Sequence, residues 1–323
     1  MMPRILVVGS ANMDLVVKAP RMPVGGETVM GGEFSTVRGG KGANQAIACA
    51  RMGAEVWMLG CVGRDAFGDA LVEGLEADGV RCDLMRRHDS APSGIAVILI
   101  DASGENSIVV ATGANAELTG DDLNRVEDFS RFDAVLTQLE APLGAVRATL
   151  AKAREHGVRS ILDAGPPTEA AKVLVAEPDV ISPNETEAKA LLGIPMTERL
   201  EPTEAADRLI AAGARNVVLK LGAEGALVAW NSGTRSQFDT AQLGHVPEFQ
   251  RVPAFKIDPV DTTGAGDAFT AALAVSLARG DDLVRATTVG AAAGALAATV
   301  FGAAPSMPTG EAVEEFMRER GAR

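Results

Sequence analysis

A glycine-rich turn and a carboxylate stand side by side in residues Asp261–Phe269, which read DTTGAGDAF. The residues that follow, Asp267–Ala278, are rich in alanine and end before Gly280, so the sequence predicts a helix with a glycine cap. The N-terminus of that helix would present free N–H groups from about Ala265 to Asp267, which suits a phosphoryl group that gains negative charge. A carboxylate in the first helical turn also suits removal of a proton from an attacking hydroxyl. Because Asp is common at helix starts, this run alone favours a helix cap over a catalytic base.

Residues Gly39–Gln45, which read GGKGANQ, form a second glycine-rich run between a predicted strand and the predicted helix Lys41–Arg51. The glycines let a ligand lie against bare backbone, while Lys41 and Asn44 supply donors about one helical turn apart. The run is not a Walker A loop, because the long spacer and the final Lys-Ser/Thr are missing. A ligand-binding loop and a structural turn that caps the helix are equally consistent with it.

Polar residues follow several predicted strands. Asn12 and Asp14 come after the first strand, and Glu140 follows a later strand at the same edge. Open parallel sheets bind ligands at the carboxyl ends of their strands, so these residues could hold sugar hydroxyls or simply form turns. Asn184 and Glu187 fit a helix capping box, and as hard oxygen donors they could equally organise magnesium and its waters.

The elements that must position these residues alternate between strand and helix for most of the chain. Short apolar runs predict strands at Ile5–Gly9, Val56–Gly60, Ala134–Gln138, Ser160–Asp163, Asp179–Ser182, Asn216–Lys220 and Ala226–Trp230. Periodic segments predict helices at Lys41–Arg51, Phe67–Ala77, Leu143–Glu155, Glu185–Leu192 and Thr203–Ala211. Such alternation predicts an α/β fold, with a mostly parallel sheet covered by helices on both faces. Leu221–Gly225 would be a hairpin turn and a candidate floor for a nucleotide.

Two pairs of strands break this alternation, because no helix separates their members. The pairs are Leu15–Val17 with Thr28–Val37, and Gly94–Ile100 with Ser107–Ala111. Each pair should be antiparallel, and together the insertions at about 12–38 and 93–112 predict a small antiparallel sheet beside the main one. We interpret this sheet as a lid that keeps water from a reactive phosphoryl group, with ordinary edge strands as the alternative. An exposed sheet of this kind also invites a second copy of the chain.

Composition excludes several classes of function. The formal net charge of -13 over 323 residues argues against a nucleic-acid partner, which needs an excess of Lys and Arg. The three cysteines have no metal-ligand spacing and form an odd set, so we expect reduced thiols in a cytoplasmic protein: Cys49, Cys61 and Cys82. The three histidines are widely separated, which offers no zinc site and no Ser-His-Asp triad.

Neither end of the chain predicts a membrane segment. Residues Met1–Gly9 hold one Arg and a short apolar strand without a cleavage pattern, so a signal peptide is not expected. Residues Thr287–Pro305 carry no charge, but they are mostly Ala, Gly and Thr, which insert weakly into bilayers. We therefore predict a buried helix there and no membrane partner.

Taken in order along the chain, these features resemble the ribokinase family of sugar kinases. The resemblance covers essentially the whole chain, 1–323, as one α/β domain. It is carried by Ser10–Asp14, Gly39–Gln45, Gly104–Asn106, Gly113–Asn115, Gln138–Glu140, Asn184–Glu187, Asp261–Asp267 and Gly302–Pro308. The GGKGANQ and DTTGAGD runs are specific. The first of them, with the GAN run at 113–115, looks more like the ribose-phosphorylating members than fructokinases or nucleoside kinases.

The resemblance implies ATP-dependent phosphorylation of D-ribose at O5 to give D-ribose 5-phosphate. Asp267 would be the general base, and the transferring phosphoryl group would be held by the backbone N–H groups of Gly264, Ala265, Gly266 and Asp267. The sugar hydroxyls would be bound by Asn12, Asp14, Gly40, Lys41, Asn44, Glu140 and Asp267.

The resemblance also implies ATP, Mg²⁺ and a monovalent cation, usually K⁺. Asn184 and Glu187 would face the phosphates and magnesium, with Glu187 acting through water. The ATP cleft would be lined by Lys220–Gly225, including Lys220, Gly222 and Gly225. The monovalent cation would be surrounded by Asp261, Thr263, Ser306 and the backbone carbonyls of Ala297, Val300 and Gly302. A homodimer through the lid strands is implied as well.

Some departures from the family leave alternatives open. The segment Asn231–Gln250 looks longer than the family needs, and its aromatic residues could alter the adenine side of the cleft or cover a partner surface: Phe238, His245 and Phe249. The substrate could instead be deoxyribose, fructose, an acidic sugar or a nucleoside, although no extra Arg near the motifs offers a carboxylate partner. A sugar-binding protein without catalysis is a further alternative. A dinucleotide-dependent oxidoreductase is disfavoured, because the first strand does not lead into a GxGxxG run.

Overall fold

The computed structural model describes residues 2–231 and 247–322. Most of the long Asn231–Gln250 segment, with Phe238 and His245, therefore lies outside the described residues. The statements below concern the described part of the chain.

The main sheet confirms the predicted parallel architecture. Among the described residues it has the strand order β15-β14-β13-β12-β11-β10-β1-β4-β6. The strands are β1 Arg4–Val8, β4 Glu55–Leu59, β6 Val80–Arg81, β10 Ala134–Gln138, β11 Arg159–Asp163, β12 Val180–Ser182, β13 Asn216–Lys220, β14 Ala226–Asn231 and β15 Pro247–Val252. All neighbours pair in parallel except β13 with β14 and β14 with β15, which are antiparallel.

Helices cover both faces of this sheet, as predicted. Along β1 the side chains alternate, so Ile5 and Val7 belong to one buried cluster while Leu6 and Val8 belong to the other. The first cluster lies under α1 Lys41–Arg51, α2 Ala66–Ala77, α6 Ala265–Ala278, α7 Leu283–Ala297, α8 Ala303–Ser306 and α9 Gly310–Glu319. The second lies under α3 Leu143–Glu155, α4 Glu185–Leu192 and α5 Pro202–Ala211. A two-stranded sheet, β5 Cys61–Gly63 with β7 Arg86–His88, completes the base of the molecule.

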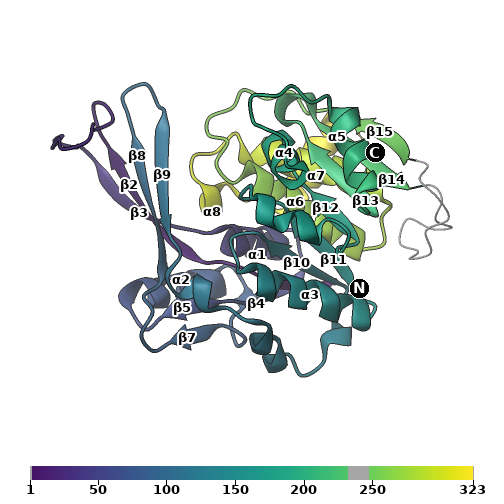
Figure 1. The fold of residues 1–323 in the computed structure, drawn as a ribbon, viewed down its shortest axis with the longest axis horizontal. Helices are drawn as coiled ribbons and strands as arrows, with labels where there is room; N and C mark the ends of the chain where they lie inside the picture. Colours follow the sequence, from purple (N-terminus) through teal and green to yellow (C-terminus); the bar gives the residue numbers. More distant parts are fainter. Residues whose placement is uncertain (1, 232–246, 323) are drawn as a thin grey trace.

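A separate four-stranded sheet rises beside the main body, at the left of Figure 1. Its order is β3-β2-β8-β9, with β2 Asn12–Lys18, β3 Phe34–Gly39, β8 Gly94–Ile100 and β9 Asn106–Ala111. Both predicted antiparallel pairs are confirmed, and a parallel pairing of β2 with β8 joins them. The strand predicted to start at Thr28 was wrong in its boundary, because it begins at Phe34, after Gly31 and Gly32. Glycine is a poor strand former, so regular pairing starts only beyond it.

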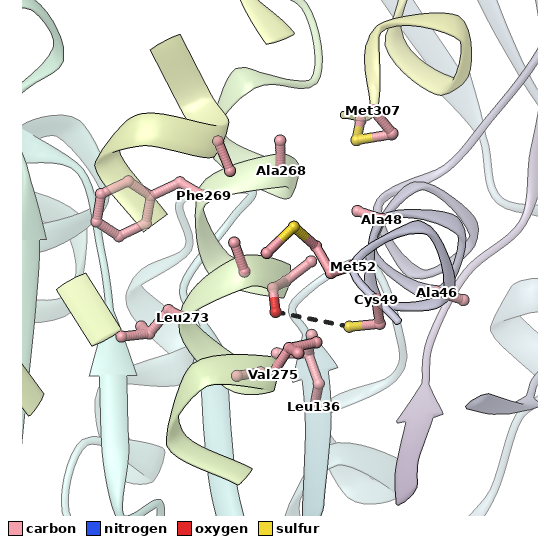
Figure 2. Close-up of a cluster of buried hydrophobic side chains, with 14 of the residues drawn as sticks. Ala46, Ala48, Cys49, Met52, Leu136, Ala268, Phe269, Leu273, Val275 and Met307 are labelled. Atoms are coloured by element: carbon pink, nitrogen blue, oxygen red, sulfur yellow. Dashed lines mark hydrogen bonds between the residues drawn. The ribbon is translucent and has the colours of Figure 1, made fainter. Parts of the chain in front are cut away.

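The helices α1 and α6 pack closely through small side chains (Figure 2). Ala46 and Cys49 of α1 and Ala268 of α6 belong to the same buried cluster. The Cys49 thiol donates a hydrogen bond to the carbonyl oxygen of Ala271 at 3.7 Å. This packing brings the first turns of the two helices together, and both turns carry polar residues singled out above.

The uncharged stretch from Thr287 forms most of α7, which is largely buried against the core as predicted. Within the described ranges, every helix is too short or too polar to span a lipid bilayer.

Candidate active site

The backbone at the start of α6 forms a turn with exposed amides. The helix begins at Ala265, two residues before the predicted start, and Gly264 caps it with a φ of 79°. That left-handed conformation favours glycine, and a Cβ there would also lie 2.8 Å from the terminal carbon of Met307. The expectation of free amides holds in part, because the Ala265 N–H donates to the Thr262 carbonyl at 3.1 Å. Within the described residues, the N–H groups of Gly264, Gly266 and Asp267 have no acceptor.

The Asp267 carboxylate is buried beside these amides and is contacted by three side chains of α1. Asn44 Nδ2 donates to Oδ2 at 2.9 Å, and Gln45 Nε2 donates to Oδ1 at 3.0 Å. The Lys41 ammonium lies 3.7 Å from Oδ1. The charge of Asp267 raises the pKa of Lys41 despite the opposing effect of burial, so Lys41 stays protonated. The structure thus brings together Lys41, Asn44 and Asp267, which belong to the two glycine-rich runs.

Asp163, which the sequence reasoning missed, is the centre of the contacts on the far side of Asp267. It is fully buried and accepts hydrogen bonds from Gln45 Nε2 at 2.8 Å, Lys220 Nζ at 3.2 Å and the Thr270 hydroxyl at 3.0 Å. Burial alone would raise the pKa of Asp163, but the charges of Lys220 and Lys41 bring it below its ordinary value. The signal was available, because Asp163 ends a predicted strand as Gln138 does. We call Lys41, Gln45, Asp163, Lys220 and Asp267 the buried network.

Glu187 lies next to this network and also caps a helix. Its Oε2 accepts the Asn184 N–H at 2.8 Å while its own N–H donates to Asn184 Oδ1 at 2.8 Å, so the capping box is real. The Lys220 ammonium is 4.0 Å from Oε2. Burial raises the pKa of Glu187, although Lys220 opposes this effect. A Cβ at Gly165 would lie 2.6 Å from Glu187 Oε1 and 2.9 Å from Lys41 Nζ, so glycine leaves room for both groups.

Glu140 organises the other side of the site. Its Oε2 accepts the Ser10 hydroxyl at 2.5 Å, the Lys41 N–H at 3.0 Å and Asn12 Nδ2 at 3.5 Å. Gly40, with a φ of 90°, lies so close to the Asn12 backbone that a Cβ would come within 2.7 Å of its nitrogen. These contacts bring Asn12, Gly40, Lys41 and Glu140 together at the N-terminal end of β2. Asn12 and Asp14 belong to that strand and not to a turn.

Asn115 and Asp14 complete that side. Asn115, given no role by the sequence reasoning, is buried and donates to Asn12 Oδ1 at 2.8 Å and to the Ala11 carbonyl at 3.1 Å. Its position in the GAN run at 113–115 was the signal that could have found it. Burial, with the negative charges of Glu140 and Asp267, raises the pKa of Asp14 from an ordinary value of 3.8 to about 7.

Most of the residues expected around a monovalent cation lie on two loops that meet before α6, whereas Ala297 is the last residue of α7 and Ser306 the last residue of α8. We call residues 260–264 and 298–302 the Asp261 loops. Asp261 Oδ2 accepts the Gly302 N–H at 2.9 Å, and Oδ1 accepts both the N–H and the hydroxyl of Thr263. These hydrogen bonds lower the pKa of Asp261 although burial opposes them. The Ala297 carbonyl accepts the Val300 N–H at 3.1 Å, and the buried Ser306 hydroxyl donates to Ala303.

The turn between β13 and β14 holds the residues expected at the nucleotide. Lys220 points into the buried network, and a Cβ at Gly266 would lie 3.9 Å from its ammonium, which places it beside the free amides. Gly222 has open space around it, with a φ of 54°. Gly225 has a structural reason to be glycine, because a Cβ there would lie 2.1 Å from the Val252 carbonyl oxygen.

Comparison with known proteins agrees with this geometry. Residues 2–310 match the model of the pfkB family carbohydrate kinases. The ribokinase of Bacillus subtilis (strain 168) is 38% identical over 317 residues, which cover 98% of this chain and 100% of that protein. A deoxyribokinase of Salmonella typhi is 33% identical over 315 residues, covering 97% of this chain and 98% of that protein. The structure of Arabidopsis thaliana ribokinase complexed with ribose and ATP superimposes with a TM-score of 0.84 at 34% identity, over 98% of this chain and 99% of that one.

Proposed function

The chain belongs to the pfkB family of carbohydrate kinases, and we propose that it transfers the terminal phosphoryl group of ATP to O5 of D-ribose. One observation carries the proposal: a buried carboxylate, Asp267, stands beside free amides at the N-terminus of α6. A hydroxyl placed at the carboxylate would then face a phosphoryl group placed at the amides. Ribokinases at up to 38% identity over nearly the whole chain support ribose as the sugar.

In the proposed reaction the sugar lies between the foot of β2 and the start of α1. Its hydroxyls are held by Asn12, Asp14, Gly40, Lys41, Asn44 and Glu140. Asp267 takes the proton of the O5 hydroxyl as O5 bonds to the terminal phosphorus, and the bond from that phosphorus to the bridging oxygen of ATP breaks. ADP and D-ribose 5-phosphate are the products. The contacts of Asn44 and Lys41 with Asp267 support this arrangement.

The phosphoryl group is stabilised by the amides of Gly264, Ala265, Gly266 and Asp267 and by the positive end of α6. Of these four N–H groups, Ala265 is the one already used within the turn, so the other three carry most of this role. Lys220–Gly225, with Gly222 and Gly225, lines the ATP cleft in this proposal. The proximity of Lys220 to Gly266 supports it.

Mg²⁺ fits beside Glu187. Among the described residues, Oε1 of that carboxylate accepts no hydrogen bond, and Asn184 holds the other oxygen in place. Asn184 and Glu187 would hold the ion through water, where it would neutralise part of the phosphate charge. The donors expected in and beside the Asp261 loops are all oxygens, which suits K⁺ or a similar cation. Asp261, Thr263, Ser306 and the carbonyls of Ala297, Val300 and Gly302 would hold it and so order the turn before α6.

The four-stranded sheet serves as a lid and as a dimer surface in this proposal. Its hairpins are inserted at about 12–38 and 93–112 of a single domain. On the face opposite Asp14, register places Phe34, Val97 and Val109, which are 63%, 36% and 69% exposed. Exposed apolar side chains on one sheet support burial against a second copy. Val109→Lys should then convert a dimer to a monomer in light scattering, and an unchanged mass would contradict the dimer surface.

A cytoplasmic location is part of the proposal. The three cysteines are free, and two of them are buried. Free thiols are typical of a reducing compartment. Fractionation of cells that produce the protein would test this placement.

Deoxyribose is a second candidate substrate, because deoxyribokinases are also 33% identical over nearly the whole chain. Turnover of a sugar panel, followed by coupled ADP detection with and without K⁺, separates the candidates. We expect D-ribose to give the highest kcat/KM and K⁺ to raise it. A higher kcat/KM with deoxyribose would make deoxyribose the preferred substrate. Sugar binding without ADP formation would favour a sugar-binding protein without catalysis.

A further inference from the structure

Two glutamine amides form a buried chain behind Asp267. Gln45 Nε2 donates to Asp267 Oδ1 at 3.0 Å and to Asp163 Oδ2 at 2.8 Å. Gln45 Oε1 in turn accepts Gln138 Nε2 at 2.6 Å. Both glutamines are fully buried, so water does not compete for these hydrogen bonds.

The orientation of both amides follows from their partners. Carboxylates only accept hydrogen bonds when ionised, so the two N–H groups of Gln45 must face Asp163 and Asp267. Its oxygen must then face Gln138, whose NH₂ group is the donor. A Cβ on Gly9 would lie 2.0 Å from Gln138 Oε1, so only glycine leaves room for the Gln138 amide in this position.

This arrangement has an energetic cost within the fold. Gln138 Oε1 is buried and has no hydrogen-bond partner among the described residues. A buried amide oxygen without a partner is unfavourable, because it loses its hydrogen bond to water on folding. The cost is explained if the Gln138 amide is needed to hold Gln45 in one orientation.

We propose, on the basis of the kinase function above, that Gln45 is a positioning residue for the base Asp267 and that Gln138 orients Gln45. Asn44 holds Oδ2 of the carboxylate and Gln45 holds Oδ1, so the two amides fix the plane of the carboxylate. Gln45 touches neither substrate in this proposal and acts through Asp267.

The test compares Gln45→Met with the parent enzyme. Methionine keeps the size of the side chain and removes both donors. We expect kcat with the preferred sugar to fall on the order of 10- to 10²-fold, because a misoriented base reacts slowly. The Kd for the sugar, from calorimetry, should change less than about twofold, since every sugar-binding side chain remains.

The contrast between kcat and the Kd for the sugar is a readout that a merely structural role would not give. The charged groups that face Asp267 are Lys41 on α1, Asp163 on β11 and Asp14 on β2. None of them is altered by Gln45→Met. A fall in kcat without a change in Kd would therefore come from the orientation of Asp267 and not from a changed charge.

Two further variants keep the test decisive. Gln138→Met touches neither carboxylate and should give a smaller loss of kcat, again without a change in the Kd for the sugar. Thr149→Val is the matched control, because it removes a buried hydrogen bond on α3, from the Thr149 hydroxyl to the Ala145 carbonyl, and should leave kcat unchanged. If Gln45→Met does not fold, as judged by thermal unfolding, Gln138→Met decides.

The outcomes separate this inference from the proposed function. An active parent enzyme with unchanged kcat in both glutamine variants would overturn the inference alone. A parent enzyme without turnover on any sugar would overturn both. If the preferred sugar is not ribose, the same comparison is made with that sugar.

Discussion

Two regions meet at the N-terminus of α6 and are built in opposite ways. In the buried network, Asp163 is 0% exposed and every charged group is paired by side chains from other elements. In the Asp261 loops, Val260 and Phe301 are 66% and 63% exposed. The loops are joined by the Gly302 N–H, which donates to the Asp261 carboxylate, and by the N–H groups of Val260 and Asp261, which donate to the Ala298 carbonyl. The proposed base, Asp267, is therefore held by side chains of the protein, whereas the adjoining turn depends on few contacts.

One site therefore combines a fixed part, the buried network, with an open part, the Asp261 loops. A general base works best when its donors are oriented before the reaction and water is excluded. A turn that receives a nucleotide has to admit and release it, so its local stability has to be low. We infer that catalytic power resides in the network and that cation and nucleotide control reside in the loops.

The largest effect is expected at the centre of the network. Asp267→Asn should lower kcat by about 10²- to 10⁴-fold, because the base can no longer take the proton. The Kd for ribose should stay within a few-fold of the parent value, since Asn12, Lys41 and Glu140 remain in place. Single-turnover kinetics and calorimetry measure the two quantities. Turnover close to that of the parent would remove Asp267 from the mechanism, and loss of sugar binding would mean that the network is not held independently of it.

Much of this site could be predicted because its residues follow local rules. Glycine-rich turns before helices and polar residues after strands identified Asp267, Lys41, Asn44 and Glu140, and the structure brings all four together. The mostly parallel main sheet followed from alternating strands and helices, although its strand order was not predicted and β3 runs over Phe34–Gly39 where Thr28–Val37 was predicted.

The remaining residues could not be found from spacing alone. Gln45 and Gln138 are 93 positions apart, and their amides meet only because α1 packs over β10. Asp163 and Lys220 likewise pair across 57 positions. Such pairings depend on tertiary packing, which a periodic pattern does not encode for single polar residues.

Asp261→Ala tests whether the loops can fail while the network survives. It removes the acceptor for Gly302 and Thr263, so the turn before α6 should lose its position. We expect kcat to fall about 10- to 10²-fold and the response to K⁺ to disappear, because small displacements of a phosphoryl site are costly. The midpoint of thermal unfolding should change little, since the loops are exposed. Asp258→Ala, an exposed carboxylate nearby, is the control and should behave like the parent.

A large fall in the unfolding midpoint of Asp261→Ala would contradict this difference between the loops and the network. The loops would then contribute to global stability as the network does. Calorimetric scans of both variants in the same buffer distinguish the two cases.

The pH dependence of sugar affinity comes from Asp14, whose pKa is raised to about 7 by burial and by the charges of Glu140 and Asp267. The ionised form accepts hydrogen bonds from sugar hydroxyls, so KM for ribose should fall about tenfold as pH rises from 6 to 8. The sugar affinity thus increases with pH, whereas the free energy of unfolding decreases. The folded state binds the extra proton between the unfolded and folded pKa values, so stability decreases as pH rises through that window. Asp14→Asn should remove both dependences, and a parent KM that is flat from pH 6 to 8 would contradict the assignment.

The smallest effect is expected from Gly302→Ala, which adds one methyl group in the loops. Gly302 has φ 85° and ψ 156°, a conformation that is essentially restricted to glycine, and a Cβ there would meet only Pro305 at 3.6 Å. Gly302→Ala should therefore cost about 1–3 kcal/mol of local strain without a clash, and the concentration of K⁺ for half-activation should rise about fivefold or more. Gly280→Ala is the matched control, because Gly280 has a φ of 97° with open space around it but lies at the far end of α6. If Gly302→Ala and Gly280→Ala changed K⁺ activation equally, the loops would not be the site of cation control. A change confined to Gly302 would support cation control in the loops, separate from the base held by the network.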